Sequence, residues 1–278
     1  MKKSALIILT IILVATMMLA FTGCSSASTQ DKLSGVWQPY EQYVYDVDRN
    51  GQKGTYTVEV IFNIEPTITL GEMTVENVKE GYIIKGKLEI ANSIYETACY
   101  MQKTSGSKLY VPIASYTKKD DGQYVNKIEG KYTDKEFNYT ITKYGAPKED
   151  SISIKAPCYD NNQVHQLLRA VDSLGTSLSF TFNVPLATEN ELVSLTASCS
   201  VTSEINWGDG LTTTCNKVYL SRQTKVDGAS HILYYSSKAL TIDGYELKNV
   251  LVRFDEPING DSYTVYTLKS ISLIPPQA

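Results

Sequence analysis

The chain contains 278 residues, with 26 lysines and arginines against 30 aspartates and glutamates and a formal net charge of −4. This slightly acidic balance argues against a large basic patch, so we expect no nucleic-acid partner. Tyrosine is abundant at 20, whereas tryptophan and histidine each occur only 2 times. Because tyrosine suits half-buried pleated strands and domains centre on about 100–150 residues, the composition favours two small β-rich domains.

The first residues have the order of an export signal. Lys2 and Lys3 precede an apolar run over residues 5–21, and a small residue, Gly23, stands directly before Cys24. A charged start, an apolar segment and small residues at the cut are typical of such signals. The alternative is an uncleaved anchor helix, but the run is slightly shorter than the roughly 20 apolar residues that a membrane span needs.

The cut site resembles the lipobox of bacterial lipoproteins. The resemblance implies that residues 1–23 are a signal peptide and that a diacylglycerol is attached to the Cys24 thiol. Residues 24–32 would then form a polar, serine-rich tether. We therefore expect an extracytoplasmic protein at the cell surface, anchored to a bacterial membrane through its N-terminal lipid.

Alternating apolar and polar side chains predict β-strands along most of the chain. Apolar residues recur at every second position over residues 56–62, 137–141, 178–184 and 193–201. A period of two indicates strands with one buried and one wet face. Turn sequences that contain glycine separate these runs. The sequence therefore predicts an all-β fold.

The first folded segment, residues 33–145, opens with Gly35-Val36-Trp37. A Gly-x-Trp in the first strand, followed by antiparallel strands with short hairpins, resembles the lipocalin-like or calycin barrels of bacterial lipoproteins. The resemblance implies a tryptophan that closes one end of a barrel whose open end holds a small apolar ligand. The arginine that this family places against the tryptophan is missing, since Arg49 lies in a turn, and another β fold is the alternative.

Asp46, Asp48 and Asn50 alternate as the oxygen ligands do at the start of a calcium loop. The twelfth position of such a loop needs a bidentate carboxylate, and Thr57 stands there. The flanking residues read as strands, with Asn50-Gly51 as the turn pair between them. We therefore favour a hairpin over this weak calcium candidate.

A turn-rich, charged segment at residues 145–150 is the predicted domain boundary. Beyond it, residues 151–278 are predicted to form a β-sandwich that includes one helix. Asn162 would cap that helix over residues 163–174, and Gly175 would end it.

The sequence Trp207-Gly208-Asp209-Gly210 resembles the W-x-GDG signature of PKD-like immunoglobulin sandwiches on bacterial surfaces. The resemblance implies a tryptophan in the core and a Gly-Asp-Gly turn, which makes the motif a folding device. The last strands resemble those of jelly-roll carbohydrate-binding modules. If sugar binds there, the aromatic platform would be formed by exposed Tyr234, Tyr235, Tyr263 and Tyr266.

Four cysteines follow Cys24, and outside the cytoplasm they could form two disulfides in three connectivities. We favour a bridge between Cys199 and Cys215, because Cys199 lies on an apolar strand face and Cys215 follows the Gly-Asp-Gly turn. Two free buried thiols are the alternative.

Catalytic motifs are missing from the sequence. His165 lies on the predicted helix and His231 at a strand start, and neither belongs to a recognisable triad. We therefore expect no enzymatic activity and no cofactor. The leading hypothesis is a binding lipoprotein for a glycan or a small apolar ligand. The alternative is a structural or protein-interaction lipoprotein, such as an adhesin or an envelope assembly factor.

Overall fold

The structure, a computed structural model, describes residues 36–103, 110–171, 174–175, 178–222, 230–259 and 262–275. One antiparallel sheet of 14 strands dominates it, in the order β10-β9-β8-β7-β6-β5-β2-β1-β18-β17-β14-β13-β12-β11. Its strands are β1 (Tyr40–Arg49), β2 (Gln52–Asn63), β5 (Gly81–Ile90), β6 (Ser93–Lys103), β7 (Tyr110–Asp120), β8 (Val125–Tyr132), β9 (Glu136–Lys143), β10 (Ala146–Ser153), β11 (Ser179–Leu186), β12 (Glu191–Trp207), β13 (Leu211–Arg222), β14 (His231–Ser236), β17 (Leu251–Asn259) and β18 (Ser262–Ser272). Two small hairpins pair β3 (Thr67–Leu70) with β4 (Met73–Glu76) and β15 (Leu240–Ile242) with β16 (Tyr245–Leu247).

Strands β1 and β18 join the two halves of the chain into one sheet. The residues of β1 from Gln42 to Arg49 pair with β18 in an antiparallel ladder. The all-β prediction is confirmed, but the division into a lipocalin-like domain over residues 33–145 and a β-sandwich over residues 151–278 is wrong. Residues 145–150 lie in the β9–β10 hairpin of this same sheet: Gly145 belongs to its turn, and residues 146–150 pair with β9, so they form no linker.

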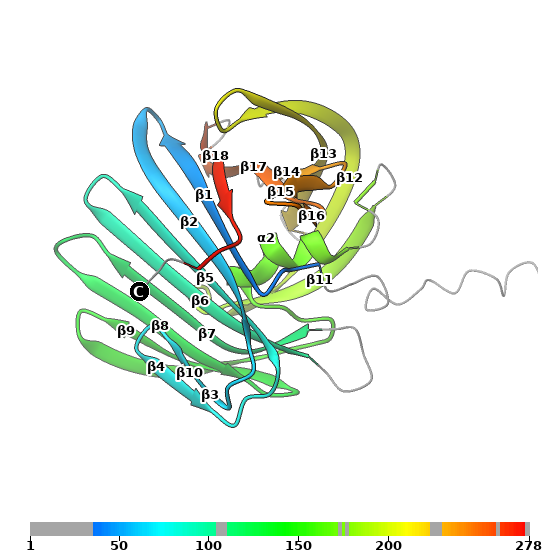
Figure 1. Cartoon of the computed structure of the whole chain (residues 1–278). Coiled ribbons are helices and arrows are strands. Elements are labelled where there is room, and N and C mark those ends of the chain that lie inside the picture. Colours follow the sequence, from blue (N-terminus) through cyan, green and yellow to red (C-terminus); the bar gives the residue numbers. More distant parts are fainter. Residues whose placement is uncertain are drawn as a thin grey trace, which may run out of the picture.

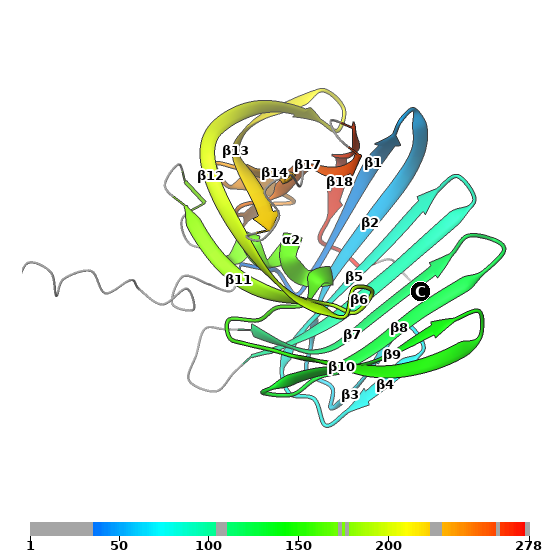
Figure 2. The same cartoon turned by 180° about the vertical axis from the view of Figure 1, so that it is seen from behind.

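The sheet curls into a nearly closed barrel around a short helical segment (Figures 1 and 2). The β9–β10 hairpin at one edge meets the β11–β12 hairpin at the other edge through side chains. The Tyr139 hydroxyl donates to Asn190 Oδ1 at 3.0 Å, and Phe137 and Ile152 pack in a cluster that includes Leu192. Side-chain packing therefore connects the two ends of the sheet, where no backbone hydrogen bonds pair the described strands β10 and β11.

The helical segment is shorter than the sequence predicts. Asp160 caps it by accepting a hydrogen bond from the Asn162 backbone N–H at 2.8 Å, and Val171 is already extended, with ψ of 121°. The predicted helix over residues 163–174 therefore lies in the right place but has the wrong cap and length. Its turns are η2 (Asn161–Gln163), α2 (Val164–Leu167) and η3 (Leu168–Ala170).

Alternate residues of the strands face opposite sides of the sheet. Ile84 and Cys99 belong to the main core, together with the helical segment inside the barrel. Ile83 and Tyr100 belong to a second core, which the β3–β4 hairpin covers from the outer side. The barrel wall is thus packed on both faces in this part of the sheet.

The turn pair at the tip of β1 and β2 confirms the predicted hairpin. Asn50 and Gly51 adopt φ of 52° and 86°, the left-handed conformation that a tight hairpin turn requires. Asp48 accepts a hydrogen bond from the Gly51 N–H at 2.8 Å and forms an ion pair with Lys53. Asp46 pairs with a lysine of β18. The two carboxylates of the weak calcium candidate, which also includes Asn50, therefore already have partners.

The Gly-Asp-Gly sequence forms the tip between β12 and β13, as predicted. Gly208 and Gly210 adopt φ of 53° and 85°. Trp207 is buried and donates a hydrogen bond from Nε1 to Thr213 Oγ1 at 2.8 Å. The motif is a folding device, but the PKD-like sandwich that it implied is wrong, because this hairpin belongs to the barrel sheet.

The four cysteines within the described ranges do not form disulfides. Cys199 lies opposite Val218, three residues along β13 from Cys215, which is about 10 Å at the rise of a strand. A disulfide needs Cα atoms roughly 4.4–6.8 Å apart. The predicted Cys199–Cys215 bridge is therefore wrong, and the free thiols are Cys99, Cys158, Cys199 and Cys215.

The predicted signal peptide over residues 1–23, the lipid site at Cys24 and the tether over residues 24–32 lie outside the described residues. Lipid anchoring therefore stays a prediction. Among the helices of the described residues, none has the length and hydropathy needed to cross a bilayer.

Candidate functional site

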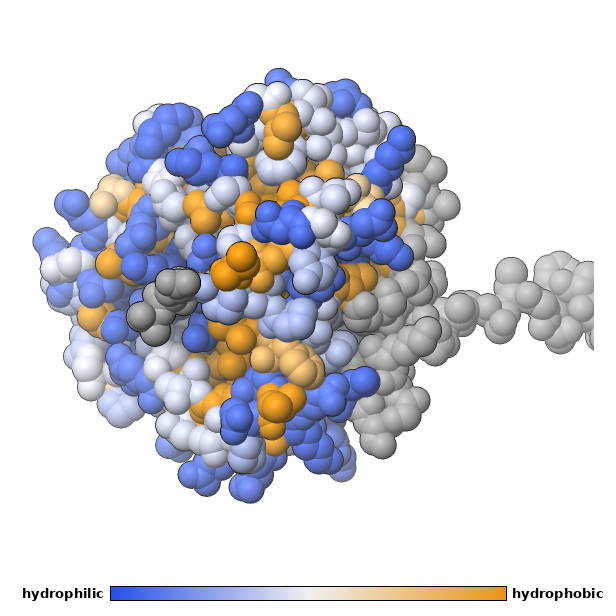
Figure 3. All heavy atoms as spheres, in the orientation of Figure 1, coloured by the Kyte–Doolittle hydropathy of each residue, from blue (hydrophilic) through white to orange (hydrophobic). Residues whose placement is uncertain are grey.

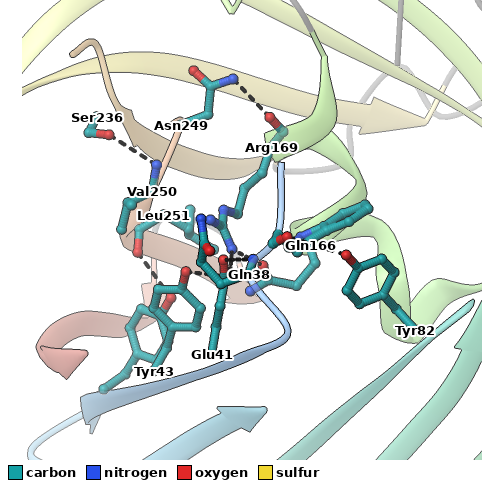
Figure 4. Close-up of polar contacts among 12 residues, drawn as sticks. Gln38, Glu41, Tyr43, Tyr82, Gln166, Arg169, Ser236, Asn249, Val250 and Leu251 are labelled. Atoms are coloured by element: carbon teal, nitrogen blue, oxygen red, sulfur yellow. Dashed lines mark hydrogen bonds and ion pairs between the residues drawn. The ribbon is translucent and has the colours of Figure 1, made fainter. Parts of the chain in front are cut away.

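A buried ion pair fixes the helical segment to the barrel wall (Figure 4). Arg169 Nη1 lies 2.6 Å from Glu41 Oε2, and neither side chain has any exposed surface. Glu41 also accepts hydrogen bonds from the Tyr43 hydroxyl at 2.7 Å and the Gln38 backbone N–H at 2.8 Å. Gln166 Oε1 accepts a second bond from Arg169 Nη1 at 2.9 Å. The carboxylate is thus fully paired inside the protein.

The tyrosine beside this ion pair stays protonated. Burial raises the pKa of Tyr43 well above its usual value, and the nearby Arg169 opposes that shift. The guanidinium carbon of Arg169 lies 5.0 Å from the centroid of the Tyr43 ring, which is cation–π distance. Since Arg169 and Glu41 are fully buried and neither lines the cavity described below, the cluster has a structural role.

Further hydrogen bonds hold both ends of the helical segment. The Tyr235 hydroxyl donates to the backbone oxygen of His165 at 2.8 Å. Asn249 Nδ2 donates to the backbone oxygen of Arg169 at 2.8 Å. At the other end, the Tyr132 hydroxyl donates to the capping carboxylate of Asp160 at 2.6 Å. These bonds come from β14, the loop before β17 and β8, so the segment is fixed from several sides.

One face of this fixed segment borders the cavity that is our candidate site. The cavity has a volume of about 590 Å³ and lies between the start of the helical segment and strands β11, β12, β13, β14 and β17. Such a volume falls within the roughly 300–1,000 Å³ of small-molecule sites. The lining residues are Asn161, Val164, His165, Val184, Leu186, Glu189, Val193, Leu195, Leu220, Arg222, His231, Glu256, Pro257 and Ile258.

The two histidines of the chain both line this cavity, although 65 residues separate them in sequence. Burial, with a smaller contribution from the nearby His231, lowers the pKa of His165 to about 3. Burial also lowers the pKa of His231, where Glu256 acts in the opposite direction and Arg222 in the same direction as burial. Both imidazoles are therefore neutral at pH 7, and each offers one donor and one acceptor nitrogen.

Aromatic stacking fixes the histidine and the carboxylate on this wall. The His165 ring lies 4.7 Å from the ring of Phe254, which stacks on Tyr266 at 4.0 Å. Tyr266 in turn donates its hydroxyl to Glu256 Oε2 at 2.9 Å. The imidazole and the carboxylate are thus set by rigid rings of β17 and β18.

The charged residues at the edge of the cavity form a pair of their own. Arg222 binds both carboxylate oxygens of Glu189, at 3.0 and 2.8 Å. Arg222 ends β13, and Glu189 lies in the turn between β11 and β12. This bidentate contact compensates both charges and sets the geometry of the cavity edge.

Apart from Asn161 at the start of the helical segment, the rest of the wall is apolar. It consists of inward-facing residues that alternate along β11, β12 and β13, together with one residue of the helix and two of β17. The cavity therefore combines an apolar surface with a compact set of hydrogen-bonding groups, the arrangement that binds amphipathic molecules. The apolar members are Val164, Val184, Leu186, Val193, Leu195, Leu220, Pro257 and Ile258.

Comparison with known proteins supports the single-barrel architecture. No family model and no curated protein matches the chain. Among solved structures, the fold is similar to a β-barrel-like protein of the domain of unknown function DUF1849 from Brucella abortus. The two share 13% identity and a TM-score of 0.50 over 86% of this chain and 100% of that one. At this identity the likeness shows the fold alone, and it overturns the lipocalin-plus-sandwich prediction.

The predicted tyrosine platform is not on the surface. Tyr234, Tyr235 and Tyr266 are only 8%, 0% and 3% exposed, and Tyr263 is half-buried. The prediction failed because these strands lie in a barrel wall whose inner face is packed and not in a sandwich with an open outer face. Among the four, Tyr266 contributes to the candidate site, through its bond to Glu256.

Trp37 occupies a buried position among other aromatic rings. It packs against Tyr82 and Tyr110, with ring centroids 5.2 and 5.7 Å away. The arginine that enters the barrel is Arg169, and it pairs with Glu41. The tryptophan is thus a core residue of the described barrel.

Sequence reasoning noted His165 and His231 singly but did not bring them together. It missed Arg222, Glu189 and Glu256 altogether. The scarcity of histidine was a usable signal, since both imidazoles of the chain serve one cavity. Their proximity depends on the order of the strands in the sheet. The alternation of apolar and polar side chains predicts strands but not their order.

Proposed function

We propose that the protein is a lipid-anchored extracytoplasmic lipoprotein that binds a small amphipathic molecule inside its barrel. The single observation that carries the binding role is the cavity of about 590 Å³, with its apolar wall and its His165, His231 and Glu256 side. The predicted lipid anchor at Cys24 supports an extracytoplasmic location. A ligand with a hydrocarbon body and one polar end would fill both parts of such a site.

Rigid walls favour binding in a preformed cavity. The ion pair of Arg169 with Glu41 and the bond from Tyr235 to His165 fix the helical segment before any ligand arrives. A site that is already shaped avoids part of the entropic cost of ordering side chains on binding. The geometry thus suits a binding module better than a flexible interaction surface.

The binding proposal is tested by filling the cavity. The mature chain, with Cys24→Ser to prevent lipid attachment, is titrated with a neutral phenylnaphthylamine dye whose fluorescence rises in apolar surroundings. We expect saturable binding that Leu195→Trp weakens at least tenfold, because Leu195 lines the cavity. Val201→Trp on the same strand is the control, since Val201 is 49% exposed. Equal binding by both variants would contradict the proposal.

The anchor is tested separately. Mass spectrometry of the protein from its native membrane should show a chain that begins at Cys24 and carries a diacylglycerol. An intact starting methionine or an unmodified Cys24 would contradict the localisation and leave the cavity proposal standing.

A second candidate function, contact with another protein, has one supporting observation. Tyr124 and Tyr144, on neighbouring hairpin tips, are 50% and 73% exposed, and their rings lie 4.8 Å apart. On the face shown in Figure 3, however, polar side chains break up the apolar surface. Pull-down of a defined partner by the wild-type chain, with loss in Tyr124→Ser and Tyr144→Ser, would favour this function.

A further inference from the structure

We infer that the ligand of the barrel cavity carries a protonated amine at its polar end, so that an amphipathic amine binds in preference to a neutral or anionic amphiphile. This inference rests on the proposed binding function and names the class of ligand. It depends on the charges that line the cavity and on which of them have partners.

Glu256 carries the uncompensated charge of the cavity. Arg222 and Glu189 neutralise each other through their bidentate contact. Glu256 accepts a hydrogen bond from the neutral Tyr266 hydroxyl and forms no ion pair within the described residues. The nearby Arg49 donates its Nε to Thr264 Oγ1 at 3.1 Å. With neutral histidines, the lining therefore has one net negative charge.

The histidines add hydrogen-bond acceptors to this carboxylate. His231 Nδ1 is buried and has no hydrogen-bond partner. The β14–β17 ladder pairs Ile232 with Asp255, so His231 and Glu256 lie side by side on neighbouring strands. His165 stacks on Phe254, which precedes Glu256 by two residues on β17, so the three groups lie on one side of the cavity. An ammonium group offers three donors and no acceptor, which matches a carboxylate beside neutral imidazoles. A carboxylate head would instead face a like charge in a poorly solvated site.

The apolar wall receives the other end of the ligand. Leu195, Val193 and Leu220 line the cavity on β12 and β13. Burying a hydrocarbon body there releases water from apolar surface on both partners. The site therefore fits a molecule with one ammonium group on a compact hydrocarbon part.

A matched series of decyl probes tests the inference on the Cys24→Ser mature chain. Decylamine, decanol and decanoate share one hydrocarbon chain and differ in head charge. Each displaces the phenylnaphthylamine dye at pH 7.5, below the concentration at which the probes aggregate. We expect decylamine to displace the dye at least tenfold more strongly than decanol, and decanoate to be the weakest.

Glu256→Gln isolates the charge. Glutamine can still accept the Tyr266 hydrogen bond, so we expect decanol binding to stay within about twofold and the amine preference to fall to about threefold or less. Glu246→Gln is the control, because Glu246 is exposed on β16, away from the cavity. It should leave the preference unchanged.

The outcomes separate the two proposals. If all three decyl probes displace the dye equally, or if decanoate is the strongest, the amine inference is overturned while the cavity stands as a binding site. If none of them displaces the dye and the dye itself does not bind, both proposals are overturned. An amine preference that survives Glu256→Gln also overturns the inference, because the carboxylate would then not be its source.

Discussion

Two polar clusters lie inside the same barrel, and they differ in the ion-pair and hydrogen-bond partners of their carboxylates. Glu41 has an arginine, a tyrosine hydroxyl and a backbone N–H as partners, all enclosed. Glu256 has one tyrosine hydroxyl and faces a cavity. The comparison teaches that the fully buried ion pair builds the structure, whereas the carboxylate that faces a cavity is available to a ligand.

Breaking the enclosed cluster should have the largest effect on stability. Arg169→Met leaves the Glu41 carboxylate buried without a counter-charge, so we expect a loss of about 3–5 kcal/mol in the free energy of unfolding. Urea denaturation of the mature chain measures it. The double variant Arg169→Met with Glu41→Gln removes both charges and should recover part of the loss. A single-variant loss below about 1 kcal/mol would show that the pair is not buried as described.

Removing one hydrogen bond from the same cluster should cost less. Tyr43→Phe deletes the hydroxyl that donates to Glu41, and a bond to a charged group contributes about 1.5–3 kcal/mol. Tyr263→Phe serves as the control, since Tyr263 is half-buried on β18. The same urea titration should separate the two variants, and equal midpoints would contradict the role given to Tyr43.

The cavity histidines should make stability depend on pH. Burial holds the pKa of His165 near 3, below the value of about 6.5 expected when the chain is unfolded. Below pH 6.5 the unfolded chain therefore takes up a proton that the folded chain does not, and stability falls as pH falls. Linkage gives a loss of about 1–2 kcal/mol between pH 7 and pH 5. Denaturation of wild type and His165→Gln at both pH values isolates this contribution, which the variant should lack.

The ion pair at the cavity edge should have the smallest effect. Arg222 and Glu189 have side chains that are 24% and 43% exposed, so Arg222→Met should change the free energy of unfolding by about 0–1 kcal/mol. The change in the free energy of unfolding is compared with that of Arg169→Met, because both variants remove an arginine that pairs with a carboxylate. Equal losses would contradict the distinction between the two clusters.

The sequence carried the local features of the fold. Alternation predicted strands where β2, β9, β11 and β12 lie, and Asn50-Gly51 and the Gly-Asp-Gly sequence predicted two hairpin tips. These features depend on side-chain period and backbone φ, which neighbouring residues determine. Local physics was therefore enough for the all-β class.

The pairing of distant strands could not be predicted in the same way. The β1–β18 ladder brings Arg49 opposite Thr264, and nothing in either strand specifies the other. Without that ladder, the charged hairpin segment at residues 145–150 looked like a linker, and buried Tyr235 looked exposed. The candidate site could not be predicted for the same reason. His165 and His231 line one cavity only because β14 and the helical segment belong to the same barrel.

The most direct test of the cavity as a ligand site is a crystal structure of the mature chain soaked with decylamine. We expect the alkyl chain to lie against Leu195 and Leu220, with the amine nitrogen within hydrogen-bond distance of the Glu256 carboxylate. An empty cavity at saturating probe, or a probe seated only on the outer surface beside Tyr124 and Tyr144, would contradict the role that we assign to the interior of the barrel.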